Sequence, residues 1–362
     1  MRTPLLAALL LSATTMLPFA AHATTPATAV ALNPACEHGG GAVDESGFIT
    51  LGGIRQWVTV EGKDCGNPVV LMVHGGPGNP NTLFAHTVYG SWSSEFTVVQ
   101  WDQRGSGKTW GANADTREQP LSLELLANDG IEVARYIRQR LGKRKLILMG
   151  GSWGSAVAVQ MAQTAPELFH AYVGTAQLVS YADNVATSYR YVLMLAQQSG
   201  DAETVQALTT IGPPPWTNPR AFGILRRAGR KFEAGRIEPA PKAWWAPLPG
   251  YDTPQYEADY EAGEDFSFVQ FVGMAGDGMG PQLDLRRLGT RFAMPVYLLQ
   301  GEQDSVTTLD VSKAYFESLS APQKEFFPLQ RTGHDPNPIM VDAQFDVLKT
   351  RVRPTAMAAD TP

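Results

Sequence analysis

The chain has 362 residues, 44% of them hydrophobic, and a formal net charge of −6 at pH 7. A negative balance of this size disfavours nucleic acids and anionic membrane surfaces as partners, because both would repel the protein. The length suffices for one large domain with an insertion or for two smaller domains, and it leaves the oligomeric state open.

The first 23 residues have the pattern of a secretory signal peptide. Arg2 precedes an apolar run that ends at Ala21-His22-Ala23, an A-x-A cleavage pattern. The run is short for a membrane span, and an uncleaved anchor is the alternative. We therefore expect cleavage after Ala23 and a periplasmic or secreted protein without a membrane partner.

Cys36 and Cys65 are the two cysteines of the chain. In an oxidising compartment they can form a disulfide that ties an extended N-terminal arm, residues 24–45, to the first strands; two free thiols are the alternative. Two cysteines at this separation make a poor metal site, and the sequence contains no H-E-x-x-H motif. We expect no metal or other cofactor.

Short apolar runs alternate with helical patterns up to residue 178. A helix is expected over 122–141, with Ser122 as its N-cap and Gly142 as its stop, and a helix of small residues precedes Pro166. Strands are expected at 47–60, where Gly52-Gly53 divides two of them, and at 69–73, 96–101, 145–149 and 171–176. This alternation predicts an α/β fold, with a parallel sheet covered by helices on both faces.

The alternation stops between residues 179 and 289, which we interpret as an inserted helical cap. Helical patterns over 184–211 and 219–235 flank three prolines, and a Pro- and Trp-rich stretch and an acidic run follow. Strands are again expected at 295–301 and 324–329, with helices at about 309–319 and 338–352. The domain prediction is thus a core of residues 24–178 and 290–362, interrupted by the cap and ending in a disordered tail.

The sequence Gly150-Gly151-Ser152-Trp153-Gly154 lies between a buried strand and the helix of small residues. G-x-S-x-G at such a junction is typical of a nucleophile elbow, a tight turn that exposes its serine at the carboxyl end of the sheet. The flanking glycines remove side chains that the turn would force together. We predict that Ser152 is a nucleophile; the alternative is a glycine-rich turn whose serine only caps the helix.

A nucleophilic serine needs a histidine base and an acid that orients the histidine. In the chain order expected with a nucleophile elbow, the acid follows the serine and the histidine comes last. Asp304 follows the strand after the cap, with Glu302 as the weaker candidate, and His334 follows the last expected strand. The predicted catalytic set is Ser152, Asp304 and His334.

Negative charge that develops on the attacked carbonyl needs backbone N–H donors. One expected donor is the N–H of Trp153, the residue after the nucleophile. The loop over residues 74–78, HGGPG, follows an earlier strand and supplies the second donor, for which we choose Gly76 over Gly75. His74 is interpreted as a structural residue that holds this loop.

Residues 102–109, DQRGSGKT, match a phosphate-binding loop only in part. The Walker pattern requires a glycine where this chain has Asp102. We therefore expect a tight structural turn in which Asp102 and Arg104 make polar contacts.

In this order, HGGPG, DQRGSGKT and GGSWGS, followed by a cap and then GEQD and GH, resemble the prolyl aminopeptidase (proline iminopeptidase) family of α/β-hydrolases. The resemblance covers residues 50–178 and 290–350. It implies an α/β-hydrolase fold, with an eight-stranded, mostly parallel sheet and a helical cap. It also implies release of an N-terminal residue, preferably proline, through an acyl-enzyme, with Ser152, Asp304 and His334 as triad and Gly76 and Trp153 as oxyanion donors.

The resemblance further implies that cap glutamates bind the free amine of the substrate, one of them typically in a Trp-Glu pair. Here Trp244-Trp245 is followed by alanine, and the carboxylates cluster between residues 257 and 265. Our candidates for substrate binding are Glu257, Glu261 and Trp245. A solvated acidic surface is the alternative for the whole run.

The leading functional hypothesis is an exported serine aminopeptidase that acts on short peptides. An esterase, lactonase or amidase with a small apolar substrate is the alternative, since the aromatic residues of the cap would suit such a pocket. Epoxide hydrolysis is not expected, because relatives with that activity carry an aspartate at the elbow, where this chain has Ser152. A non-catalytic binding protein is the third class, and the complete set of candidate residues argues against it.

Overall fold

The computed structural model describes residues 32–36 and 40–360. The predicted signal peptide and half of the predicted N-terminal arm lie outside these residues. The centre of the fold is an eight-stranded sheet with the order β1-β2-β4-β3-β5-β6-β7-β8. The strands are β1 (Val43–Leu51), β2 (Ile54–Gly62), β3 (Val69–Val73), β4 (Thr97–Trp101), β5 (Leu146–Gly151), β6 (Phe169–Thr175), β7 (Val296–Gly301) and β8 (Lys324–Leu329).

Only β2 runs against the other strands of the sheet. β1 pairs with β2, and β2 with β4, in antiparallel register, whereas all pairs from β4 to β8 are parallel. The central strand β3 is buried at every position, as its unbroken apolar sequence predicts for a strand covered on both faces. The expected mostly parallel sheet is therefore confirmed, and the carboxyl ends of β3, β5, β7 and β8 lie along one edge.

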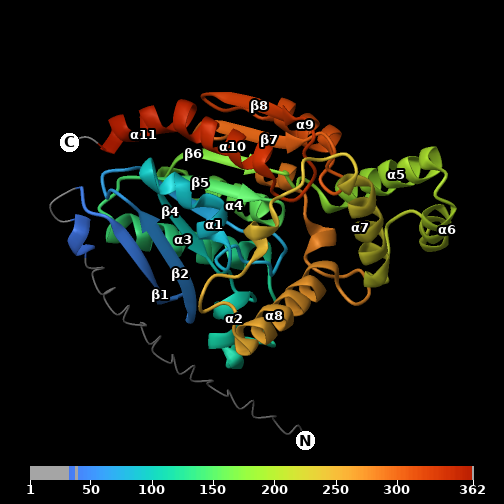
Figure 1. The fold of residues 1–362 in the computed structure, drawn as a ribbon, viewed down its shortest axis with the longest axis horizontal. Helices are drawn as coiled ribbons and strands as arrows, with labels where there is room; N and C mark the ends of the chain where they lie inside the picture. Colours follow the sequence, from blue (N-terminus) through green and yellow to red (C-terminus); the bar gives the residue numbers. More distant parts are fainter. Residues whose placement is uncertain (1–31, 37–39, 361–362) are drawn as a thin grey trace, which may run out of the picture. The chain divides into compact units, whose positions relative to one another are not determined.

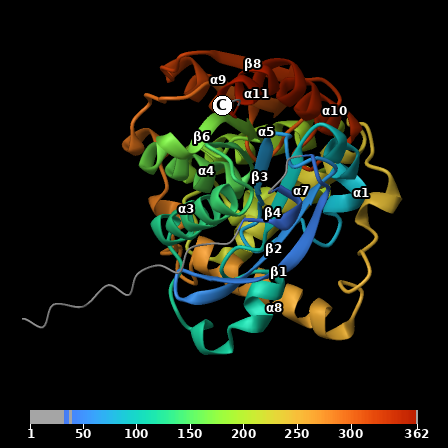
Figure 2. The same ribbon diagram turned by 90° about the vertical axis from the view of Figure 1, so that its left-hand side faces the viewer.

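Alternate side chains of β3 enter two separate apolar clusters, because successive residues of a strand point to opposite faces. Leu71 belongs to the cluster that includes residues of α3 (Leu123–Arg140), α4 (Trp153–Thr164) and α9 (Leu309–Ser318). Val70 belongs to the cluster that includes residues of α1 (Ala85–Tyr89), α10 (Pro338–Val347) and α11 (Arg353–Asp360). Figure 2 shows α3 and α4 on one side of the sheet and α1 and α10 on the other. Helices thus cover both faces, as expected.

The ends of α3 lie where the sequence predicts them. The Ser122 side chain accepts a hydrogen bond from the Leu125 N–H at 3.1 Å, which satisfies one free donor of the first turn. Gly142 follows the helix with φ of +64°, a conformation that favours glycine.

Four longer helices form the cap between β6 and β7: α5 (Tyr181–Ser199), α6 (Ala202–Ile211), α7 (Pro219–Ala234) and α8 (Pro254–Val272). The single helical segment expected over 184–211 is divided at Gly200, whose φ is +70°. Helices α5, α6 and α7 share a small apolar core of their own around Val192, Leu208 and Leu225. In Figure 1 these three helices lie together at one end of the sheet, and α8 lies apart from them, next to α2 (Gly107–Ala112).

Two expectations about the ends of the core are wrong. The arm was expected to extend to residue 45, but β1 begins at Val43, because Val43 pairs with Gly62 and is buried. The tail was expected to be disordered, but α11 continues to Asp360, because Ala356 is buried in the same cluster as Val352. Composition alone does not show this burial, which stabilises a helix of small residues.

Cys36 and Cys65 are joined in a disulfide. It ties the short segment Pro34–Cys36 to the turn between β2 and β3, as the sequence predicts. No helix among residues 32–36 and 40–360 combines the length and the apolar character that crossing a membrane requires.

Candidate active site

Ser152 lies in a strained turn between β5 and α4. Its φ is +52° and its ψ is −124°, values that a residue with a side chain rarely adopts, and its N–H donates to the Thr175 carbonyl of β6 at 3.0 Å. A Cβ atom on Gly150 would lie 2.5 Å from the carbonyl oxygen of Gly154. A Cβ atom on Gly154 would overlap the carbonyl oxygen of Val73. The two glycines are therefore required by the close approach of the backbone on both sides of the serine.

A chain of hydrogen bonds links three side chains from separate loops. Ser152 Oγ lies 2.9 Å from His334 Nε2, and His334 Nδ1 lies 3.0 and 3.1 Å from the two carboxylate oxygens of Asp304. Asp304 follows β7 and also accepts the N–H groups of Val306 and Thr307 at 2.8 and 2.9 Å. The carboxylate is thus held from several directions, and the structure brings together the three residues predicted as the catalytic set.

Burial and charge oppose each other in the His334–Asp304 pair, and both side chains are buried. Burial raises the pKa of Asp304, but the positive charge and hydrogen bond of His334 outweigh it and hold that pKa below its usual range. Burial likewise lowers the pKa of His334, but the charge and hydrogen bond of Asp304 outweigh it, so that this pKa is raised. The pair therefore favours an ionised aspartate that stabilises an imidazolium.

Both predicted oxyanion donors lie beside Ser152. Trp153 is the first residue of α4, so its backbone N–H is one of those that an α-helix leaves without a partner of its own. Gly76, in the loop after β3, has φ of +110° and lines the same small cavity as Ser152 and Trp153. A Cβ on the preceding Gly75 would lie 3.3 Å from the Ser152 Cβ, so a glycine keeps this approach open.

His74 holds the loop that contains these glycines. Its Nδ1 donates to the Gly75 carbonyl at 2.9 Å, and its Nε2 accepts the Gln103 N–H at 3.0 Å. Burial lowers its pKa to about 4, so the ring is neutral and keeps both bonds. The interpretation of His74 as a structural residue agrees with this geometry.

Residues 102–109 form a structural turn, as predicted, and not a phosphate-binding loop. Asp102 accepts the Thr82 hydroxyl at 2.6 Å and the Lys108 N–H at 2.9 Å, and burial raises its pKa to about 7. Arg104 forms a buried pair with Asp129 at 2.9 Å. Both charged residues are thus occupied by contacts inside the fold.

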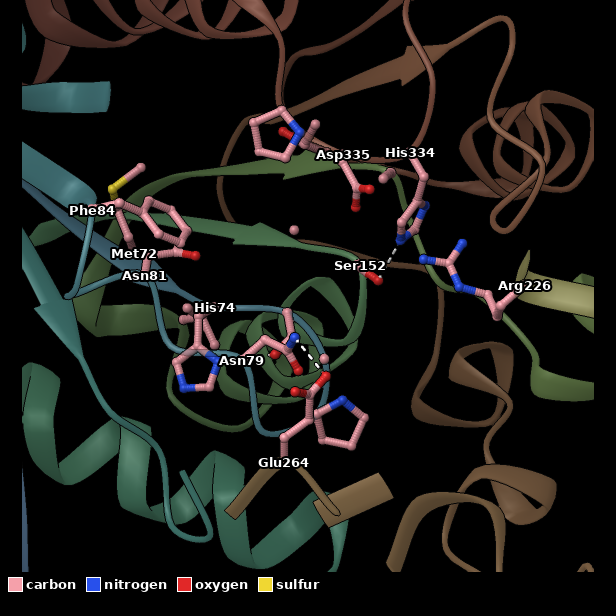
Figure 3. Close-up of a pocket in the computed structure, with 18 of the residues that line it drawn as sticks. Met72, His74, Asn79, Asn81, Phe84, Ser152, Arg226, Glu264, His334 and Asp335 are labelled. Carbon is pink, nitrogen blue, oxygen red and sulfur yellow. Dashed lines mark hydrogen bonds between the residues drawn. The ribbon is translucent and has the colours of Figure 1, made fainter. Parts of the chain in front are cut away.

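Ser152 faces a cavity of about 800 Å³ between the core and the cap. Arginines of α7 line one part of its wall, and Glu264 and Asp265 of α8 line another. Figure 3 shows Ser152 and His334 in this cavity, with Glu264 hydrogen-bonded to Asn79. A second cavity of about 80 Å³ adjoins Ser152 and is mostly apolar. Its apolar and aromatic lining consists of Trp153, Leu178, Tyr181, Val185, Phe222, Leu225, Phe271 and Val306.

Known proteins of similar sequence and a family model support the fold. A family model described as the α/β hydrolase fold matches residues 68–203. The probable aminopeptidase YbaC of Bacillus subtilis (strain 168) is 27% identical over 296 residues, which cover 80% of this chain and 90% of that protein. The chain therefore has the α/β-hydrolase fold.

Two further proteins that are similar to this chain are named as proline iminopeptidases. A probable proline iminopeptidase of Streptomyces coelicolor is 24% identical over 293 residues, which cover 75% of this chain and 85% of that protein. The crystal structure of the proline iminopeptidase of Mycobacterium smegmatis has a TM-score of 0.59 at 18% identity, and covers 87% of this chain and 100% of that one. At this identity the solved structure shows the fold alone.

Two of the three candidates for substrate binding lie away from the large cavity. Trp245 lines the cavity, but Glu257 and Glu261 are exposed and do not line it. Glu257 lies two turns before Glu264, where α8 packs against α2, so it is too far along the helix to reach the site. The acidic residues of α8 that line the cavity are Glu264, whose carboxylate accepts from Asn79 Nδ2 at 3.0 Å, and Asp265.

Sequence reasoning also missed Glu233, a buried carboxylate of α7. It accepts the N–H of Ser305 at 2.8 Å and the N–H of His334 at 3.2 Å, as well as the Ser305 hydroxyl. One cap residue thus joins the loop of Asp304 to the loop of His334. No local motif marks this contact, which forms only when α7 is placed against both loops.

The part of the chain that the structure describes contains no group of three or more His, Cys, Asp or Glu side chains placed to hold a metal ion. The arrangement around Ser152 supplies a nucleophile, a base and hydrogen-bond donors from the protein alone. Such a set can transfer an acyl group to water.

Proposed function

We propose that this protein is a serine aminopeptidase that releases the N-terminal residue of short peptides, with proline as the preferred residue. The observation that carries the proposal is the chain Ser152–His334–Asp304 opening onto the same cavity as Glu264. The names of the B. subtilis and S. coelicolor relatives support the peptidase assignment.

In the proposed mechanism, Ser152 attacks the carbonyl carbon of the first peptide bond. His334 Nε2 takes the serine proton and passes it to the leaving amine, while Asp304 orients the ring and stabilises its positive charge. The N–H groups of Trp153 and Gly76 bind the oxyanion. Water, activated by His334, then hydrolyses the acyl-enzyme and frees the amino acid.

Recognition of the free amine is assigned to Glu264. Its carboxylate is half-buried at the cavity wall and is oriented by Asn79, so it presents a fixed negative charge to an ammonium group. Asp265 adds a second carboxylate to the same wall. This assignment replaces Glu257 and Glu261 as the acidic residues of the substrate site.

Hydrolysis of a small apolar ester is the second candidate. The apolar cavity of about 80 Å³ beside Ser152 favours it, since an uncharged acyl group needs no carboxylate to bind there. Solved structures that share the fold include an esterase and a putative epoxide hydrolase.

We further propose that the protein is exported after cleavage near Ala23. The sequence pattern of residues 1–23 supports this proposal, as does the disulfide between Cys36 and Cys65, a bond typical of oxidising compartments.

The test compares hydrolysis of proline 4-nitroanilide, its N-acetyl form and 4-nitrophenyl acetate. We expect the free-amine substrate to be cleaved much faster than the N-acetyl form, and Ser152→Ala to abolish cleavage.

Glu264→Gln should raise KM for the free-amine substrate about tenfold, since a charge-assisted hydrogen bond is lost. Glu257→Gln on the same helix is the matched control and should leave KM unchanged.

Cleavage of the ester and of the N-acetyl substrate, with none of the free amine, would contradict the aminopeptidase proposal and favour the esterase. Activity that survives in Ser152→Ala would contradict the whole mechanism.

A further inference from the structure

Helix α7 contributes three arginines to the wall of the large cavity: Arg226, Arg227 and Arg230. Within the described part of the chain, none of the three has an ion-pair partner within 4.0 Å or a hydrogen bond to another side chain. Lys231 of the same helix, by contrast, lies 2.5 Å from Asp201. Arg220 at the start of the helix is also unpaired among the residues described, but it is exposed and does not line the cavity. The cavity wall thus contains three arginines that have no ion-pair partner among residues 32–36 and 40–360.

Arg226 is the innermost of the three and lines both cavities beside Ser152. Its Nη1 is fully buried without a hydrogen-bond partner among the residues described. Asp335 lines the same cavity but forms no ion pair with it. An unpartnered guanidinium nitrogen in a buried position is costly unless an anionic ligand accepts its hydrogen bonds.

Apart from Asp335, which follows His334, the basic and acidic residues of the cavity come from different helices. The arginines come from α7, whereas Glu264 and Asp265 come from α8, and Figure 3 shows Arg226 and Glu264 on different sides of Ser152. A short peptide has the same arrangement, because its ammonium lies on one side of the first peptide bond and a carboxylate on the other. An arginine fork matches the geometry of a carboxylate with two parallel hydrogen bonds.

We infer that Arg226, Arg227 and Arg230 bind a carboxylate on the leaving-group side of the scissile bond, and that the enzyme therefore prefers di- and tripeptides with a free C-terminus. This inference rests on the proposed peptidase function. The carboxylate can be the C-terminus or an acidic side chain of the leaving residue, and the test separates these two sources.

The test measures kcat/KM for Pro-Ala, Pro-Ala amide, Pro-Asp amide and proline 4-nitroanilide. We expect the wild-type protein to favour Pro-Ala over its amide by about tenfold or more, the effect of one charge-assisted contact. Restored activity on Pro-Asp amide would show that a side-chain carboxylate also binds; continued low activity would restrict the site to the C-terminus.

The double variant Arg227→Gln, Arg230→Gln should lose most of the preference for Pro-Ala but keep its rate on the nitroanilide, which carries no carboxylate. Both side chains are exposed, so the fold should tolerate the change. Arg220→Gln, an exposed arginine of α7 that does not line the cavity, is the matched control and should retain the preference.

Equal kcat/KM for Pro-Ala and its amide would overturn the inference, as would an equal loss of nitroanilide and Pro-Ala activity in the double variant.

If no peptide or anilide is cleaved, the peptidase proposal itself fails. The carboxylate site is then tested with esters, by comparing 4-acetoxybenzoate with phenyl acetate. A preference of about tenfold for the carboxylate, lost in the double variant, supports the site, and equal rates overturn it.

Discussion

At the scale of single residues, the pKa of His334 governs the proposed chemistry, because the ring must be neutral to accept the Ser152 proton. Asp304 raises this pKa above the ordinary value of 6.5. A base with a raised pKa becomes protonated earlier as the pH falls. We therefore expect kcat/KM on proline 4-nitroanilide to decline on the acid side with a midpoint above pH 6.5, as a pH–rate profile will show.

The control for this prediction is Asp304→Asn. It should lower the acid-side midpoint, because the charge that favours the imidazolium is gone, and should slow the reaction by roughly 10⁴-fold, because the ring loses its orientation. An unchanged midpoint in this variant would show that Asp304 does not set the pKa of His334.

The sequence predicted the residues that follow strands better than those of the cap. Ser152, Asp304 and His334 each come directly after a predicted strand, and the parallel sheet brings such positions to one edge. Glu257, Glu261 and Glu264 instead fall on one stripe of α8, with spacings of four and three residues. The sequence shows that these three glutamates share one face of α8. Which of them lines the cavity depends on how α8 packs against the core.

At the scale of elements, α7 supports the site through Glu233, which accepts N–H groups from the loops after β7 and β8. We expect Glu233→Gln to lower kcat about tenfold with little change in KM, since a buried charged acceptor is lost while the cavity walls remain. Because the His334 loop is displaced, the acid-side midpoint of kcat/KM should also move. A purely structural role would lower the melting temperature without moving that midpoint.

Glu203→Gln, an exposed glutamate of α6, is the matched control for Glu233→Gln and should leave both kcat and the midpoint unchanged. Wild-type kinetics in Glu233→Gln would rule out the positioning role.

Most elements of the core were predictable because they are marked locally. β3 has the bounds expected from its apolar run, and α3 ends within a residue of its expected limits, because Ser122 and Gly142 bound the helix. The division of the cap segment at Gly200 was missed, since a glycine within a helical pattern does not by itself end a helix. Helix α11 was missed because its stability comes from burial against a distant cluster.

At the scale of the whole molecule, the two parts of the proposed site come from different layers. The sheet edge supplies the nucleophile, base and oxyanion donors, and the cap supplies the charged groups that would select the substrate. The chemistry is therefore predictable from the core pattern alone. Substrate choice depends on the placement of α7 and α8, which no motif in this chain encodes.

The disulfide lies at the opposite end of the sheet from this site. Cys65 precedes β3, whereas Ser152 follows β5, which runs parallel to β3. The bond links residues 29 positions apart and restricts the unfolded chain.

We expect the double variant Cys36→Ser, Cys65→Ser to lower the free energy of unfolding by roughly 3 kcal/mol, measured by urea denaturation. Its kcat/KM at 25 °C should equal that of the wild type, because no residue of the site touches the bond. Equal stability of the two proteins, with the wild-type bond shown intact by thiol titration, would contradict the stabilising role.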